Sequence, residues 1–313
     1  MFPNFIIIGP PKCASTSLHF YLGQHPEIFT TKVKETRFFS LHYDKGMNYY
    51  AEYFEDAGNA KAIGEATPSY SFLPFVADRI KQHFPGIKLI LCFRNPMDRT
   101  FSSWLMQKGM GKEKLSLREA IEVNRKQMDY VTLEGEKGEQ TWLNSTGNFS
   151  ADESRLRTYL QGGMFAAILK SYYKRFSPEQ IKIVFLDDLK NDFDGTMSSL
   201  FSFLGVNESF IVPNKEVVNF HFDRKANKIT NKLFGVKGTR FLIDLTPKFI
   251  KNRLKKSWRT KEPPKLEMED RLYLWEIFKN DITELEKMTG RDLSGWNPAI
   301  KKEKPVATVQ QNL

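Results

Sequence analysis

The sequence predicts an α/β fold in which a central parallel sheet is flanked by helices. Three short apolar runs, at residues 5–8, 88–93 and 181–186, have the length expected of strands that are buried on both faces. Segments with the apolar spacing of helices separate these runs. Strands that are joined through helices form parallel sheets with right-handed crossovers, so this alternation indicates the fold class.

The first strand, residues 5–8, ends at a Gly-Pro-Pro turn, and the apolar spacing of a helix begins at Leu18. Lys12 follows the turn at once, and three hydroxyl-bearing residues come next: Ser15, Thr16 and Ser17. A strand that turns into a helix in this way presents free backbone N–H groups at the positive end of the helix dipole. The pattern predicts a site for a phosphate-like anion, although a strand–helix junction without a ligand has the same pattern. It is not a Walker A loop, because Pro11 stands where that pattern needs a glycine.

The later elements continue the alternation. Residues 62–64 predict a short additional strand, and Asn95-Pro96 supplies the cap and first residue of a helix that runs to about residue 108. Two more helices are expected over residues 154–176 and about 266–288.

Two polar segments are expected to lack regular structure. Residues 131–153 contain glycines and predict a mobile loop, with a lid as one role. Residues 299–313 predict a disordered tail, which leaves residues 1–298 as a single domain.

The composition is that of a globular protein. The 313 residues are 41% hydrophobic and 27% charged. The net charge of +10 suits an anionic ligand, but it does not choose among nucleotide, nucleic acid, polysaccharide and membrane. The two cysteines, Cys13 and Cys92, make neither a disulfide framework nor a cysteine-rich zinc site.

The sequence also bears on location. No apolar run approaches the roughly 18–20 residues that cross a bilayer. The N-terminus lacks the basic region and the long apolar core of a signal peptide. We therefore expect a cytoplasmic protein without a transmembrane segment.

A second anion site is expected at Arg94 and Ser102. Arg94 comes directly after the predicted strand 88–93, and ligands of open α/β sheets bind at the carboxyl ends of strands. Ser102 lies about two turns into the next helix, on the face toward Arg94. A planar guanidinium and a hydroxyl suit a phosphate group. Anion sites at the ends of two strands of one sheet suggest a ligand with two separated phosphate-like groups.

At this point the chain resembles the PAPS-dependent sulfotransferases, in particular the heparan-sulfate-type and bacterial branch. Six segments match the family's motifs in order: residues 11–18, 34–39, 64–70, 94–102, 185–189 and 285–296. The first is similar to the 5′-phosphosulfate loop, and the fourth is similar to the 3′-phosphate motif. The resemblance implies a P-loop-like fold, with 3′-phosphoadenosine-5′-phosphosulfate (PAPS) as donor, PAP as product and no metal.

The resemblance also implies roles for individual residues. Lys12 neutralises the leaving 5′-phosphate. Backbone amides and hydroxyls of the loop hold the phosphosulfate: Ala14, Ser15, Thr16 and Ser17. Arg94 and Ser102 hold the 3′-phosphate. Arg224 and Lys225 lie where the family carries a loop over the nucleotide and contact the cofactor phosphates, unless that basic segment is simply solvated.

Glu35 is the candidate general base. It precedes Phe38 and Phe39, and an apolar wall raises the pKa of a neighbouring carboxyl toward neutrality. The alternative is an exposed glutamate that pairs with Lys34 or Arg37. Glu65 is a second candidate catalytic carboxylate, with acceptor binding, orientation of the base and a purely structural role all open. Three histidines are alternative bases: His19, His25 and His42.

Two departures from the family's motifs bear on the loop and the acceptor. Ala14 replaces the usual glycine of the anion loop, and its methyl group is tolerable only where φ stays negative. Ala66 replaces a lysine of the heparan-sulfate branch, which argues against a sulfated polysaccharide acceptor. We therefore expect sulfuryl transfer to a hydroxyl or amine of a small molecule, a natural product or a glycolipid.

Two other functions stay open at this point. A P-loop kinase for a small molecule would need ATP and a Mg²⁺ site. A non-catalytic polyanion binder would account for the charge of +10. Nucleic acid is not expected as a partner, since the chain shows none of the known nucleic-acid modules. The sequence does not indicate an oligomeric state.

Overall fold

The computed structural model describes residues 1–147, 155–216 and 264–300. Five parallel strands form one sheet in the order β2-β3-β1-β4-β5. Their bounds are β1 Phe5–Ile7, β2 Ile28–Thr30, β3 Ala62–Ala66, β4 Lys88–Phe93 and β5 Ile181–Phe185. The predicted parallel α/β sheet is confirmed. No pattern in the sequence predicts β2, which is only three residues long.

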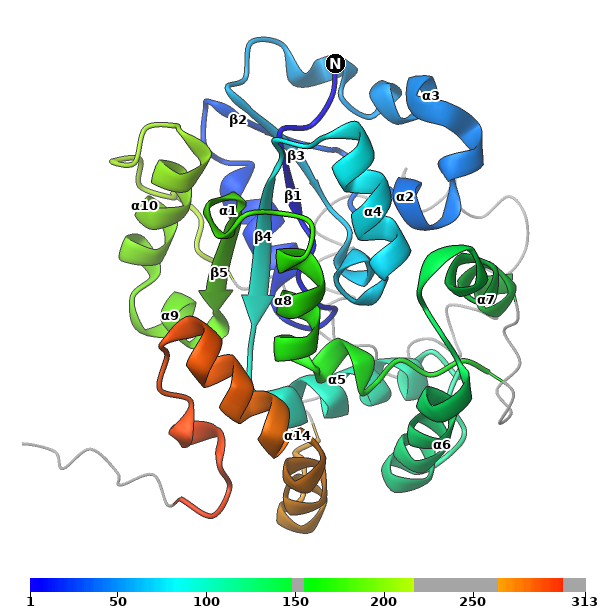
Figure 1. Ribbon diagram of the computed structural model, residues 1–313. Coiled ribbons are helices and arrows are strands. Elements are labelled where there is room, and N and C mark those ends of the chain that lie inside the picture. Colours follow the sequence, from blue (N-terminus) through cyan, green and yellow to red (C-terminus); the bar gives the residue numbers. More distant parts are fainter. Residues whose placement is uncertain (148–154, 217–263, 301–313) are drawn as a thin grey trace, which may run out of the picture.

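Helices cover both faces of the sheet (Figure 1). Helix α1 (Ser15–Leu22) contacts α10 (Phe193–Leu204) through the rings of Tyr21 and Phe193, whose centroids are 5.0 Å apart. On the other face, α4 (Pro74–His83) packs against α8 (Phe165–Tyr173), and α14 (Met268–Thr289) packs against α8 and α5 (Pro96–Gly109). The predictions for α5 and α14 are confirmed to within two residues at each end.

The remaining helices are shorter or lie at the edge of the domain. They are α2 Phe38–Leu41, α3 Gly46–Glu52, α6 Leu117–Tyr130, α7 Gly135–Gly147 and α9 Leu186–Asn191. Within the described residues, no helix is long and apolar enough to cross a membrane.

The prediction of a helix over residues 154–176 is wrong for its first part. Residues 155–160 are not helical, and α8 begins only at Phe165, after the glycine pair at residues 162–163. Side chains of α6 form hydrogen bonds with backbone groups of this segment, which would bond to one another if the segment were helical. The Asn124 side chain donates to the carbonyl of Arg157 at 2.7 Å and accepts from the amide of Leu160 at 2.8 Å.

The predicted loop over residues 131–153 contains a helix where the chain is described, while its expected mobility stays a prediction. Helix α7 occupies residues 135–147 and packs against α4 and α2. Trp142 anchors it through a ring contact with Phe72 at 5.9 Å, and Glu139 pairs with Arg79. Only a narrow face of this helix packs against the domain, so its sequence consists largely of glycines and polar residues. The apolar spacing that predicts a helix is therefore missing. Residues 148–153 and most of the predicted tail, residues 301–313, lie outside the described residues.

Candidate active site

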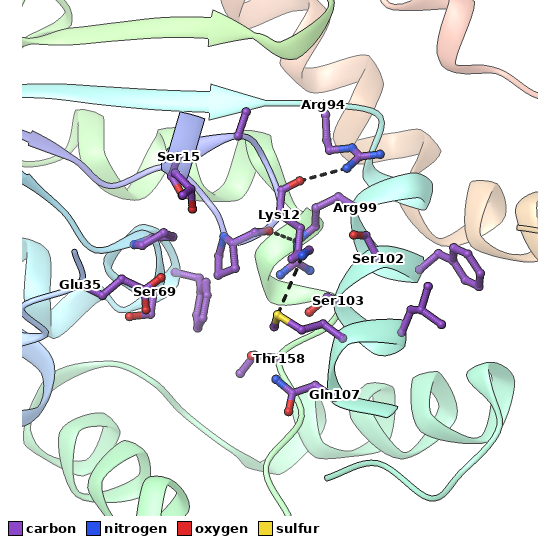
Figure 2. A pocket seen from close by; sticks show the side chains of 18 of the residues that line it. Lys12, Ser15, Glu35, Ser69, Arg94, Arg99, Ser102, Ser103, Gln107 and Thr158 are labelled. Atoms are coloured by element: carbon purple, nitrogen blue, oxygen red, sulfur yellow. Dashed lines mark hydrogen bonds between the residues drawn. The ribbon is translucent and has the colours of Figure 1, made fainter. Parts of the chain in front are cut away.

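A cavity of about 1940 Å³ opens at the carboxyl ends of β1, β3 and β4. It brings together eight of the predicted site residues: Lys12, Ala14, Ser15, Thr16, Ser17, Glu35, Arg94 and Ser102. Figure 2 shows Lys12 at the centre, with Arg94 and Ser102 to one side and Glu35 to the other. Glu65 is not among the lining residues. Arg224 and Lys225 lie outside the described residues.

The anion loop, residues 9–17, reverses the chain tightly between β1 and α1. A Cβ atom at Gly9 would lie 2.2 Å from the backbone nitrogen of Cys92, so only glycine allows the loop to pass this close to β4. Lys12 and Ala14 have left-handed backbone angles, with φ of 74° and 68°. The expectation of a negative φ at Ala14 is therefore wrong, because joining the turn to α1 needs the left-handed region at this position.

The N-terminus of α1 faces the cavity without a side-chain cap. Ala14 is its N-cap residue and has no side-chain oxygen to offer. The first backbone N–H groups of a helix have no partner within the helix, so they remain available to an anion. Ser15, Thr16 and Ser17 line the cavity at the same place. Amides, hydroxyls and the helix dipole together make a site for a tetrahedral anion.

Lys12 stands among other cations. Its Nζ atom lies 3.9 Å from the sulfur of Met106, across the cavity floor. Burial lowers the pKa of Lys12, and the charges of Arg94, Arg99 and Lys34 lower it further. Such repulsion is relieved when an anion binds between the cations, so the electrostatics of this part favour a ligand with several negative charges.

Two arginines fix the backbone of the anion loop. Arg94 donates to the carbonyl of Lys12 at 3.1 Å, and Arg99 donates to the carbonyl of Pro11 at 3.0 Å (Figure 2). Arg99 also donates to the carbonyl of Tyr159 at 2.5 Å. Both arginines therefore turn carbonyl oxygens of the loop toward themselves, where these oxygens do not repel a bound anion.

Arg99 is a site residue that the sequence reasoning missed. It is 1% exposed, and burial lowers its pKa to about 10, with a smaller effect from the charge of Arg94. The described hydrogen bonds of its guanidinium go to neutral backbone carbonyls. Its position in the same motif as Arg94, on the buried face of α5, is the signal that could have revealed it.

Glu35 lines the cavity, but its surroundings differ from the prediction. Its carboxylate lies 2.8 Å from the ammonium of Lys34 and 3.0 Å from the guanidinium of Arg37. Burial raises the pKa of Glu35, but the combined charges and hydrogen bonds of Lys34 and Arg37 outweigh burial and leave the pKa lowered. The expected rise toward neutrality is therefore wrong. Phe38 and Phe39 are fully buried and belong to the core.

Glu65 is fully buried in β3. Its carboxylate accepts hydrogen bonds from Thr67 at 2.6 Å and Tyr50 at 3.1 Å, and burial raises its pKa despite these bonds. The Thr67 hydroxyl in turn accepts from the amide of Arg37 at 3.3 Å. Glu65 is thus connected through Thr67 to the backbone of Arg37, close to Glu35 in the chain, but it does not line the cavity.

The three candidate histidines, and the two aspartates that follow β5, lie in different parts of the structure. His42 lines the cavity, and burial lowers its pKa. His19, whose pKa burial lowers to about 4, and His25 are not among the lining residues. Asp188 pairs with Arg291, and Asp187 pairs with Lys190 at 3.1 Å. In the part of the chain that the structure describes, no cluster of His, Cys, Asp and Glu suits a metal ion.

Comparison with known proteins finds sulfotransferases. The sulfotransferase domain family matches residues 2–290. A crystal structure of a sulfotransferase from Alicyclobacillus acidocaldarius superposes with a TM-score of 0.65 at 26% identity, over 95% of this chain and 99% of that one.

Two curated relatives are much longer proteins. The membrane-associated sulfotransferase kil1 of Dictyostelium discoideum is 41% identical over 105 residues, which is 33% of this chain and 22% of that protein. The human bifunctional heparan sulfate N-deacetylase/N-sulfotransferase 2 is 24% identical over 297 residues, which is 92% of this chain and 30% of that protein. The chain thus spans less than a third of either relative. Since the family match covers nearly all of the described chain and the fold agrees, the chain belongs to the sulfotransferase domain family.

Proposed function

We propose that the protein transfers a sulfuryl group from PAPS to a hydroxyl or amine of a small-molecule, natural-product or glycolipid acceptor. One observation carries the proposal. One cavity is lined by the anion loop, which leads into the uncapped N-terminus of α1, and by Arg94 and Ser102. Lys12 lies between these two parts, and Glu35 lies beyond Lys12 (Figure 2). This arrangement suits a donor with a phosphosulfate at one end and a 3′-phosphate at the other. Family membership supports PAPS as that donor.

In this mechanism the leaving group is stabilised by the donor half of the cavity, which is the part lined by the anion loop, Arg94 and Ser102. An acceptor oxygen or nitrogen forms a bond to sulfur, and the bond from sulfur to the 5′-phosphate oxygen breaks. Lys12 and the amides of the anion loop neutralise the charge that develops on this phosphate. Arg94 and Ser102 hold the 3′-phosphate, which keeps the reacting groups in line. PAP leaves as the second product.

Glu35 is the proposed general base. Its pKa is lowered, so the carboxylate is ionised at neutral pH and ready to accept a proton. An acceptor hydroxyl becomes strongly acidic as its oxygen bonds to sulfur, and a carboxylate of low basicity then suffices. The proton passes to Glu35 in this step, while Lys34 and Arg37 hold the carboxylate in place.

The cavity has apolar lining residues, which support an acceptor with an apolar part. Leu41, Phe72 and Met110 line the cavity, together with Arg37. Ala66 is fully buried and contributes no charge. Apolar side chains beside cations suit an amphiphilic acceptor, such as a glycolipid.

The direct test is a mass-spectrometric screen of alcohols, amines and glycolipids with PAPS. We expect one acceptor class to gain a single sulfuryl group together with stoichiometric PAP. Transfer of a phosphoryl group from ATP with Mg²⁺ would support the kinase alternative, and sulfation of heparan-type chains alone would contradict the acceptor proposal.

A further inference from the structure

An acidic side chain lies within the predicted 3′-phosphate site. Asp98 is on α5, four residues after Arg94 and four residues before Ser102. Residues four apart share one face of a helix, so Asp98 and Ser102 lie on the same face of α5. Asp98, Arg94 and Ser102 all line the cavity. An unpaired carboxylate at this place would repel a phosphate that Arg94 and Ser102 hold.

An arginine that is far away in the sequence forms an ion pair with this carboxylate. Arg271, in the first turns of α14, places its guanidinium nitrogen 2.5 Å from the carboxylate of Asp98. The Arg271 side chain is 24% exposed and also lines the cavity. The pair joins residues 173 positions apart in the sequence. It therefore neutralises Asp98 inside the cavity, where solvent screens charges less than at an open surface.

Helix α14 has other contacts that hold it in place. Leu274 and Phe278 are fully buried, and Lys170 of α8 pairs with Glu284 at 2.9 Å. Arg118 of α6 pairs with Asp270 at 2.6 Å. Since these contacts already attach α14 to α8 and α6, the Asp98–Arg271 pair is not needed merely to dock the helix.

We propose that Arg271 is a positioning residue for nucleotide recognition. It neutralises Asp98 and holds its carboxylate away from the 3′-phosphate that Arg94 and Ser102 bind. The inference rests on the proposed function, because it needs a nucleotide with a 3′-phosphate at this place. It assigns to α14, which lies far from both phosphate motifs in the sequence, a specific effect on the selection of the donor.

The test is a double-mutant cycle measured by titration calorimetry with PAP and with AMP, which lacks only the 3′-phosphate. Arg271→Gln should weaken PAP binding roughly tenfold or more, because it exposes the phosphate to Asp98. AMP binding should change by less than about threefold. Adding Asp98→Asn should restore PAP affinity to within about threefold of the unmodified protein. Arg271→Met serves as a second variant if the glutamine variant does not fold.

Lys170→Met is the matched control, because it removes an ion pair of the same helix away from the cavity. It should leave PAP affinity unchanged. A double variant as weak as Arg271→Gln alone would show that Arg271 contacts the phosphate itself, which overturns the positioning role. Unchanged PAP affinity in Arg271→Gln, or equal losses for PAP and AMP, would also overturn it. If the unmodified protein binds no PAP, the proposed function itself fails.

Discussion

The donor half of the cavity is fixed by arginines bound to backbone carbonyls, whereas the half around Glu35 is held by ion pairs between neighbours in the sequence. Arg94 and Arg99 reach the anion loop across more than 80 positions of the chain. Lys34, Glu35 and Arg37 pair within four consecutive residues. The donor half is therefore a product of the tertiary fold.

The two halves share one feature, which is a left-handed backbone. In the described ranges, the non-glycine residues with positive φ are Lys12, Ala14, Glu35 and Arg37. All four line the cavity. Each such residue costs about 1–3 kcal/mol and persists only where its surroundings hold it. The arginine–carbonyl contacts hold the first pair, and the Glu65–Thr67 contact with the Arg37 amide supports the second.

Of the substitutions in the two halves of the cavity, we expect Glu35→Gln to have the largest effect on turnover. Glu35→Gln should keep the fold and PAP affinity, but lower turnover with an alcohol acceptor by roughly 10²–10⁴-fold, because the amide accepts no proton. The carboxylate is active only when ionised and its pKa is lowered, so activity should fall on acidification only below the ordinary glutamate value of about 4.3. Steady-state rates across the acidic range measure both effects.

Glu65→Gln is the control for this substitution. Glu65 is buried behind the loop, so we expect a change in the free energy of unfolding and a smaller effect on turnover. Near-normal turnover in Glu35→Gln would place the base elsewhere, with His42 as the next residue that lines the cavity.

In the donor half, Arg94→Ala should weaken PAP binding by roughly 1.5–3 kcal/mol, the usual size of a charge-assisted hydrogen bond. Binding of adenosine 5′-phosphosulfate, which has no 3′-phosphate, should weaken less. Titration of both ligands measures the difference. Equal losses would mean that Arg94 acts only through its bond to the Lys12 carbonyl.

Lys12→Ala separates chemistry from binding in the same half. In the proposed mechanism its charge acts on the leaving 5′-phosphate, so turnover should fall by more than PAP affinity does. Parallel measurement of kcat and of the PAP dissociation constant checks this. A loss of affinity with unchanged kcat would assign Lys12 to ground-state binding alone.

The smallest effect is expected at Ala14. Ala14→Gly removes the strain of a φ of 68° and should stabilise the protein by about 0.5–1 kcal/mol, after the entropy of glycine is subtracted. Urea unfolding measures it. A destabilised variant would show that the methyl group packs usefully against the core.

The sequence was informative where a motif itself lines the cavity. Lys12, Arg94 and Ser102 could be placed because each follows a strand that is recognisable from its apolar run. The sequence did not reveal that Glu65 is buried, because its partner Tyr50 lies on α3, whose position depends on the whole fold. The expected rise in the pKa of Glu35 does not occur for a similar reason, since Phe38 and Phe39 turn into the core and leave two cations beside the carboxylate.

We propose that this cavity recognises a nucleotide with two separated phosphate groups. Thermal unfolding with PAP and with ATP–Mg²⁺, each over a range of concentrations, tests it most directly. We predict that PAP at a hundred times its dissociation constant adds about 2.7 kcal/mol to the free energy of unfolding, with a much smaller effect of ATP–Mg²⁺ at equal concentration. A larger stabilisation by ATP–Mg²⁺ than by PAP would contradict the account.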